Sequence, residues 1–122
     1  MRIALAMLMA IHGMAHLVGV AEAWRLGPPG FPYRTTLLAG HVHLGDVSGR
    51  AFGFVWLALA VAFVSGAVGA VGGAAWWPQA TLGAAIASLA LTVAEWPEAR
   101  PGVRMNVGII TVLVAGRLLG WF

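Results

Sequence analysis

Two histidines, His12 and His16, stand four residues apart in a long apolar stretch near the N-terminus. On a helix this spacing puts both imidazoles on one face, with about 6 Å of axial rise between them. An ionisable side chain at membrane depth usually faces the interior of a helix bundle, because facing lipid costs on the order of 3 kcal/mol. The pair therefore predicts a ligand-binding or proton-transfer site. The alternative is a packing contact in which each neutral ring hydrogen-bonds to a neighbouring group.

The acidic side chains are candidates for acid–base chemistry with His16. Glu22 lies six residues after His16, about 9 Å further along the same helix. Proton transfer needs a titratable group within hydrogen-bond reach of the substrate, so His16 with Glu22, Glu95 or Glu98 is the expected catalytic set if the protein is an enzyme. The alternative is an ordinary rim of arginine–carboxylate pairs, each contributing little to stability.

A metal site would need ligands beyond His12 and His16. His41 and His43 are the next candidates, since imidazole is the commonest protein ligand for metals and these two rings share a face if the chain is extended. The absence of cysteine excludes thiolate sites, iron–sulfur clusters and disulfides. Haem, a pigment or a transition metal are the cofactors considered, and the sequence does not name one.

The composition requires a membrane setting for these residues. Of the 122 residues 61% are hydrophobic and only 9% charged, with a mean hydropathy of +0.89. A soluble domain normally carries about 25% charged residues. The chain is therefore expected to be an integral membrane protein with the lipid bilayer as its main partner. A net charge of +3 from 7 basic and 4 acidic residues is too small for the basic stripe that nucleic-acid binding requires.

The apolar runs predict an all-α polytopic membrane protein. We expect one domain, residues 1–122, with transmembrane helices over about 3–24, 51–73, 79–96 and 103–121, each near the length of about 20 residues that a bilayer requires. The first run also resembles a signal peptide, but its two histidines favour a retained helix. The longer loop between the first two helices is expected to be partly structured. Its Gly- and Pro-rich first half predicts irregular chain, and its second half a short interfacial or re-entrant helix.

The arginines predict the orientation. With four helices, the loops after the first and third share one side, which holds five of the seven arginines: Arg25, Arg34, Arg50, Arg100 and Arg104. By the positive-inside rule this side is cytoplasmic and both termini lie outside. All four acidic residues, Asp46 included, fall on the same side, so a polar pocket is expected to open there and reach His16 and then His12.

Two segments carry a resemblance. His12–Gly19 (HGMAHLVG) and Trp96–Gly102 (WPEARPG), together with Asn106, resemble small four-helix bacterial membrane proteins with an HGxxHLxG-type first helix, usually uncharacterised and sometimes labelled permease-like. The resemblance spans the chain and implies a location in the bacterial cytoplasmic membrane. It directs attention to Glu98 and, as ligand contacts, to His12, His16, Trp96, Arg100 and Asn106. It implies no reaction, and Pro97 replaces the small hydroxyl residue expected at its position.

Three functions fit these residues. The first is a bundle that binds a cofactor, pigment or metal through His12 and His16, or an accessory subunit of a larger membrane complex. The second is a small membrane enzyme with isomerase-like acid–base chemistry on a lipophilic substrate. The third is an oligomeric transporter or channel, which needs polar residues along a whole helix, whereas the run 51–73 offers only Ser65. The extensive apolar surface and the small residues Gly69 and Gly73 favour a homo-oligomer or a subunit of a complex.

Overall fold

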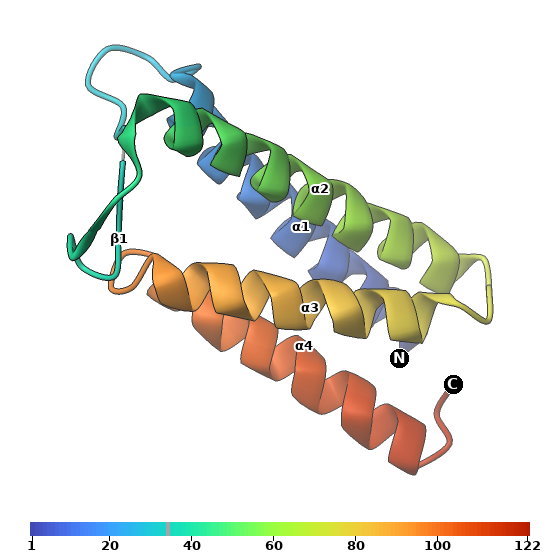
Figure 1. Cartoon of the computed structure of the whole chain (residues 1–122). Coiled ribbons are helices and arrows are strands. Elements are labelled where there is room, and N and C mark those ends of the chain that lie inside the picture. The colour runs from blue at the N-terminus through green and yellow to red at the C-terminus, as the bar shows by residue number, and fades with distance from the viewer. Residues whose placement is uncertain (34) are drawn as a thin grey trace.

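The computed structural model describes residues 1–33 and 35–122 and contains four helices and one short β-hairpin (Figure 1). The elements in chain order are α1 (Arg2–Trp24), β1 (Thr36–Leu37), β2 (Val42–His43), α2 (Gly45–Val71), α3 (Trp77–Ala94) and α4 (Arg100–Leu118). Arg34, which the sequence assigns to the arginine-rich side, lies outside the described residues. The chain is thus all-α apart from the hairpin.

The helix ends follow from local backbone chemistry. α1 stops where Arg25 takes the left-handed conformation, with φ of 56°. α3 and α4 each have a proline in the first turn, Pro78 and Pro101, where the missing N–H would have no helical partner. Gly73, with φ of +70°, provides the turn between α2 and α3 at little conformational cost.

The second half of the first loop is a hairpin, which corrects the expectation of a short interfacial or re-entrant helix. β1 and β2 pair antiparallel, with Thr36 opposite His43. Leu38, Ala39 and Gly40 have φ of 51°, 54° and 90°, so the chain reverses there instead of continuing as a helix. α2 then begins at Gly45, earlier than the expected residue 51. The Leu38 N–H donates to the Ala94 carbonyl at 2.7 Å, which ties the hairpin to the end of α3.

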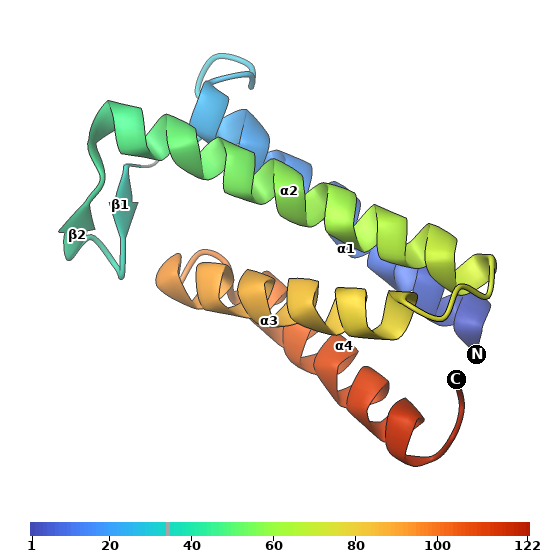
Figure 2. The same ribbon diagram turned by 45° about the vertical axis from the view of Figure 1, so that its right-hand side comes forward.

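The helices are arranged as two antiparallel pairs, α1 with α2 and α3 with α4 (Figures 1 and 2). Both termini and the α2–α3 turn lie at one end of the molecule, and the hairpin and the α3–α4 turn lie at the other. Each helix packs mainly on its neighbours in the chain, and α1 touches α4 over a short stretch. We call the line along which α1 faces α4 the seam.

Glycines bring neighbouring helices close together. A Cβ on Gly19 of α1 would overlap the indole of Trp56 on α2, and a Cβ on Gly53 of α2 would overlap the indole of Trp24 on α1. The α1–α2 interface therefore contains two close contacts in which a tryptophan of one helix packs against a glycine of the other. Gly66 and Gly69 of α2 likewise contact residues at the start of α3, so these two small residues are used inside the molecule.

Three of the helices, α1, α2 and α3, are long and apolar enough to cross a membrane. The buried faces of all four helices meet in a core that contains Met9, Phe63, Trp77 and Ile109, each essentially inaccessible to solvent. α4 carries Arg100, Arg104 and Arg117 near its ends and is not among the three. The fold is therefore a helical bundle with three helices of membrane-spanning character.

Candidate ligand-binding site

His12 and His16 both point from α1 into the bundle, as their spacing predicts. They are 5% and 2% exposed, and their rings meet edge to face with centroids 4.6 Å apart. The ring of Phe63 on α2 lies against both, at 4.7 Å from His12 and 5.3 Å from His16. The two imidazoles are thus held between aromatic and polar neighbours inside the bundle.

A chain of hydrogen bonds connects the two histidines through α3 and α4. The His12 Nε2 lies 2.9 Å from Asn106 Oδ1, and Asn106 Nδ2 donates to Ser88 Oγ at 2.8 Å. Ser88 Oγ lies 2.8 Å from His16 Nε2, and His16 Nδ1 lies 2.7 Å from the carbonyl oxygen of His12. Thr92 Oγ1 donates to the Ser88 carbonyl at 2.8 Å and accepts weakly from Asn106 at 3.5 Å. We call these five residues the polar network.

The acceptors in the polar network determine which ring nitrogens carry protons. A carbonyl oxygen only accepts, so the neutral His16 ring is protonated on Nδ1 and its Nε2 accepts from the Ser88 hydroxyl. Asn106 Oδ1 also only accepts, so His12 is protonated on Nε2. The opposite orientation of the Asn106 amide would require the single Ser88 hydroxyl proton to serve both Asn106 and His16. The two histidines are therefore opposite tautomers.

This assignment leaves one ring nitrogen for a ligand. Within the described chain His12 Nδ1 has no hydrogen-bond partner. Thr81 Oγ1 is the one fully enclosed side-chain nitrogen or oxygen without a partner among the described residues, so His12 Nδ1 is not fully enclosed. Because His12 lines a cavity, we infer that this nitrogen can accept a hydrogen bond from a molecule there.

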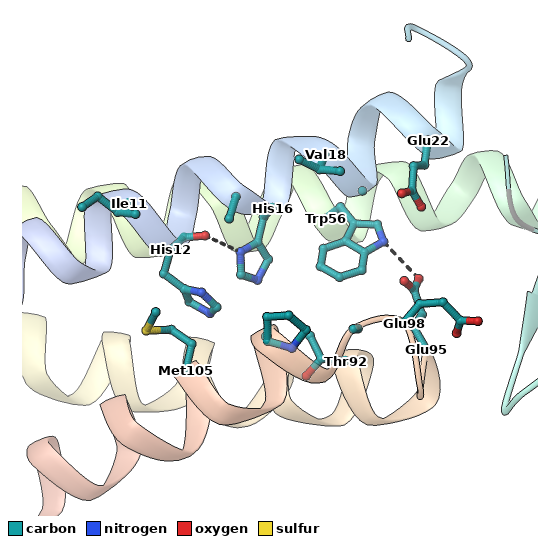
Figure 3. Close-up of a pocket in the computed structure, with 15 residues that line it drawn as sticks. Ile11, His12, His16, Val18, Glu22, Trp56, Thr92, Glu95, Glu98 and Met105 are labelled. Atoms are coloured by element: carbon teal, nitrogen blue, oxygen red, sulfur yellow. Dashed lines mark hydrogen bonds between the residues drawn. The ribbon is translucent and has the colours of Figure 1, made fainter. Parts of the chain in front are cut away.

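The cavity has a volume of about 400 Å³ and lies between α1, the end of α3 and the start of α4 (Figure 3). Its inner part contains His12, His16 and Met105, and its outer end contains carboxylates from three places in the chain. These are Glu22, Glu95 and Glu98, at the end of the molecule where the loops after α1 and α3 lie. The structure thus brings the expected pocket together, open at the charged end and reaching both histidines.

Trp56 of α2 lines the cavity between its inner part and its outer end (Figure 3). Its indole lies against His16 with centroids 5.2 Å apart, and its Nε1 donates to Glu95 Oε1 at 3.3 Å (Figure 3). Asp46, the fourth acidic residue, lies elsewhere: it accepts from Tyr33 at 2.8 Å and pairs with Arg25 at 3.4 Å. Three of the four carboxylates therefore belong to the cavity.

The ligand contacts implied by the resemblance divide into two groups. His12, His16 and Asn106 are joined in the polar network. Trp96 and Arg100 lie outside the cavity, with the guanidinium 5.0 Å from the Trp96 ring centroid. This contact is a cation–π pair between two exposed side chains.

The four histidines do not form one metal centre. His41 and His43 are exposed in the hairpin, whereas His12 and His16 are buried on α1. Among the residues that the structure describes, no group of three or more His, Asp or Glu side chains is placed to hold a metal ion. Both ring nitrogens of His16 are already used in hydrogen bonds, so chelation by the His12–His16 pair would break the polar network. The donor set does not fit a metal or haem bound through both rings.

Ser88, Thr92 and Met105 belong to the site although the sequence did not single them out. Ser88 and Thr92 are four residues apart and therefore share a helical face, which is the same spacing that drew attention to the histidines. Ser and Thr hydroxyls often hydrogen-bond to backbone carbonyls of their own helix, so this spacing is only a weak indication of a functional site. Met105 precedes Asn106 by one residue and is placed on the cavity by α4.

The comparisons with known proteins add no relative to this description. No family model matches the chain, and neither the curated proteins nor the solved structures contain a match. The resemblance to small four-helix bacterial membrane proteins stays a prediction. The class that the fold defines is a helical bundle with three apolar helices of membrane-spanning length and an internal polar network beside a cavity.

Proposed function

We propose that the protein is an integral membrane bundle of four transmembrane helices whose cavity binds a lipophilic organic molecule, such as a cofactor or pigment. The observation that carries the proposal is the cavity of about 400 Å³ that reaches an available nitrogen of His12. Ligand pockets usually measure about 300–1,000 Å³ and combine apolar walls with a few placed polar groups. The volume of the cavity, its mainly apolar walls and the His12 nitrogen are what binding of such a molecule requires.

The membrane setting with four spans is supported by where the arginines of α4 lie. Arg100 and Arg104 are near its start and Arg117 is in its last turn, so the segment between them is uncharged. Long arginine side chains near helix ends reach the lipid–water interface. With α4 as the fourth span, the arginine-rich end faces the cytoplasm and both termini lie outside, in a bacterial cytoplasmic membrane.

An organic ligand is favoured over a metal because of the polar network. Both nitrogens of His16 and one nitrogen of His12 have protein partners, which leaves a single imidazole nitrogen and no chelating pair. One imidazole acceptor at the inner end of a mainly apolar cavity is suited to orienting a ligand that is otherwise held by packing. Association with a second copy or with a larger membrane complex remains an expectation from the apolar surface.

The test is whether a ligand accompanies the purified protein and depends on the cavity. Ala15 lines the cavity on its exposed side, so Ala15→Phe should occupy it without entering the core. Ala58 is exposed on α2 and does not line the cavity, which makes Ala58→Phe the matched control. The absorption spectrum and mass spectrometry of a solvent extract would be recorded for each protein in mild detergent.

We expect one lipophilic molecule in a fixed ratio to the wild type and to Ala58→Phe, and its loss from Ala15→Phe. The proposal fails if the same molecule remains in full ratio in Ala15→Phe, since its site would then lie elsewhere. It also fails if extracts of the wild type contain bulk lipid and nothing enriched over the Ala15→Phe protein.

A second candidate function, acid–base catalysis on a lipophilic substrate, is favoured by the free nitrogen of His12. This nitrogen is a base facing the cavity, and its protonated form would retain the hydrogen bond to Asn106. His16 was expected to be the base, but both of its nitrogens are used by the protein. Deuterium uptake from D₂O into the bound molecule, lost in His12→Phe, would distinguish an enzyme from a binding protein.

A further inference from the structure

The cavity is open along the side of the bundle as well as at its charged end. Ile11, Ala15 and Val18 of α1 line the cavity and are exposed, Ile11 by 63% and Val18 by 51%. Residues spaced by four and three positions share one face of a helix. On the α4 side the lining includes the exposed Pro101 and the half-buried Met105. The cavity therefore meets the exterior at the seam between α1 and α4.

The position of the seam determines what the opening faces. Exposed apolar side chains such as Ile11 and Val18 would contact acyl chains if α1 crosses a bilayer. A molecule dissolved in the membrane can then reach His12 sideways, without crossing the charged end. The carboxylates at that end do not have to be passed.

The inner end of the cavity offers a hydrogen-bond acceptor, the Nδ1 of His12. His12 contacts His16, Phe63 and Asn106, and the three carboxylates of the cavity lie at its opposite end (Figure 3). A ligand that offers only acceptors, such as an ether or an oxidised quinone, would leave this nitrogen unpaired. A charged amine would have to be desolvated without a carboxylate beside it, which is costly. A neutral hydroxyl satisfies the acceptor at the lowest desolvation cost.

We infer that the ligand is a lipid alcohol that enters from the bilayer through the seam and donates its hydroxyl hydrogen to His12 Nδ1. The inference rests on the proposed function and specifies the chemical class and the route of its ligand. Its hydrocarbon part lies against Ile11, Ala15 and Met105 and continues through the seam into the lipid.

A matched pair of probes tests the hydroxyl. Farnesol and farnesyl methyl ether differ by one methyl group that removes the donor. Binding of each to the protein in bicelles would be measured by equilibrium titration, with concentrations expressed as mole fraction in the lipid. A neutral hydrogen bond contributes about 0.5–1.5 kcal/mol, so we expect farnesol to bind about three- to tenfold more tightly than the ether.

Three variants assign this preference to the site. In His12→Phe the alcohol and the ether should bind equally, because the ring remains and the acceptor is gone. In Ala15→Phe both probes should be excluded, and in Ala58→Phe both should bind as in the wild type. Since His12→Phe also removes the bond to Asn106, its folding is checked by circular dichroism. The wild-type comparison of the two probes stands whether or not that variant folds.

The seam is tested with a spin label, which is simple to place because the chain has no cysteine. Ile11→Cys puts the label at the edge of the cavity, and Ala58→Cys puts it on an exposed α2 position that does not line the cavity. Farnesol should lower the accessibility of the Ile11 label to oxygen, which dissolves in lipid, and leave the Ala58 label unchanged.

The outcomes separate this inference from the proposed function. Equal binding of farnesol and the ether, both excluded by Ala15→Phe, would retain a lipophilic cavity and overturn the alcohol. Farnesol binding with no change at the Ile11 label would overturn the route through the seam. Absence of farnesol binding to a wild type whose enriched molecule has no hydroxyl group would overturn the ligand class alone.

Discussion

At the residue scale, the site depends on two histidines that share a helix face and have opposite proton positions. We predict that His12 is protonated on Nε2 and His16 on Nδ1, because their partners Asn106 Oδ1 and the His12 carbonyl only accept. Nitrogen-15 NMR of the protein labelled in histidine would show one ring of each tautomer, assigned with His41→Gln and His43→Gln to remove the exposed rings. Two rings of the same tautomer would contradict the polar network.

Asn106 is the residue of the polar network that connects α4 to both α1 and α3. Replacing it with alanine would leave His12 Nε2 without its acceptor and remove a donor to Ser88, inside the bundle. We expect Asn106→Ala to lower the free energy of unfolding by about 1–3 kcal/mol, the cost of leaving buried polar groups unsatisfied.

Thr111, on the same helix, provides the control for Asn106. Its hydroxyl is exposed and bonds to the carbonyl of Val107 in its own helix. Thr111→Ala should therefore change the stability by less than about 0.5 kcal/mol. Thermal unfolding in detergent compares the two variants, and equal stabilities would show that the network bonds contribute nothing measurable.

The sequence predicted part of the site at this scale. His12 and His16 were predictable because a polar pair at helical spacing inside an apolar run is costly unless it faces inward. Asn106, Glu22, Glu95 and Glu98 were also among the candidates, and the structure places them at the site. The link through Ser88 was not predictable, since it depends on how α3 and α4 are rotated against α1. Trp96 and Arg100 were expected to contact the ligand, but they pair with each other outside the cavity.

At the element scale, the α1–α2 pair depends on glycines that face tryptophans. Gly19→Ala would drive a methyl group into the indole of the buried Trp56. We expect a loss of about 1–3 kcal/mol, typical of overpacking, together with displacement of Trp56 from Glu95. The midpoint of thermal unfolding measures the first effect, and tryptophan fluorescence follows the second.

Gly83 supplies the comparison for Gly19, since it is helical and has open space where its Cβ would be. Gly83→Ala should be neutral or stabilising by up to about 1 kcal/mol, because alanine favours the helix. Equal destabilisation by the two substitutions would mean that the α1–α2 contact at Trp56 is not close packed.

The helices were predictable and the hairpin was not. Apolar runs separated by Gly and Pro give the number and approximate positions of the helices, and errors are confined to their ends. The hairpin turns at Leu38 and Ala39, both of which have positive φ. Such positions usually carry Gly or Asn, so these two residues did not predict a turn. Its strands have two residues each, too short for a periodic pattern.

At the scale of the whole molecule, the uneven distribution of arginines between the two ends predicts how the bundle is oriented in the membrane. Arg25, Arg50, Arg100 and Arg104 lie toward the hairpin end, and Arg2 and Arg117 lie toward the end with the termini. The positive-inside rule then predicts that both termini are outside the cytoplasm. In intact cells, a membrane-impermeant maleimide should label Gly120→Cys and not Ala39→Cys.

The two cysteine positions also test whether α4 crosses the membrane. Gly120 follows α4 and Ala39 lies in the hairpin. Labelling of Ala39→Cys with protection of Gly120→Cys would reverse the orientation. Labelling of neither position before cells are opened would place both on the cytoplasmic side and argue against a fourth span.

The short contact between α1 and α4 has a consequence for how the protein is made. The main helix pairs are consecutive in the chain, so α1 with α2 and then α3 can assemble as they leave the ribosome. The hydrogen bond between His12 and Asn106 can form only after Asn106, 94 residues later in the chain, has been synthesised. The polar network is therefore incomplete in every nascent chain that lacks α4, and the arrival of the last helix completes it.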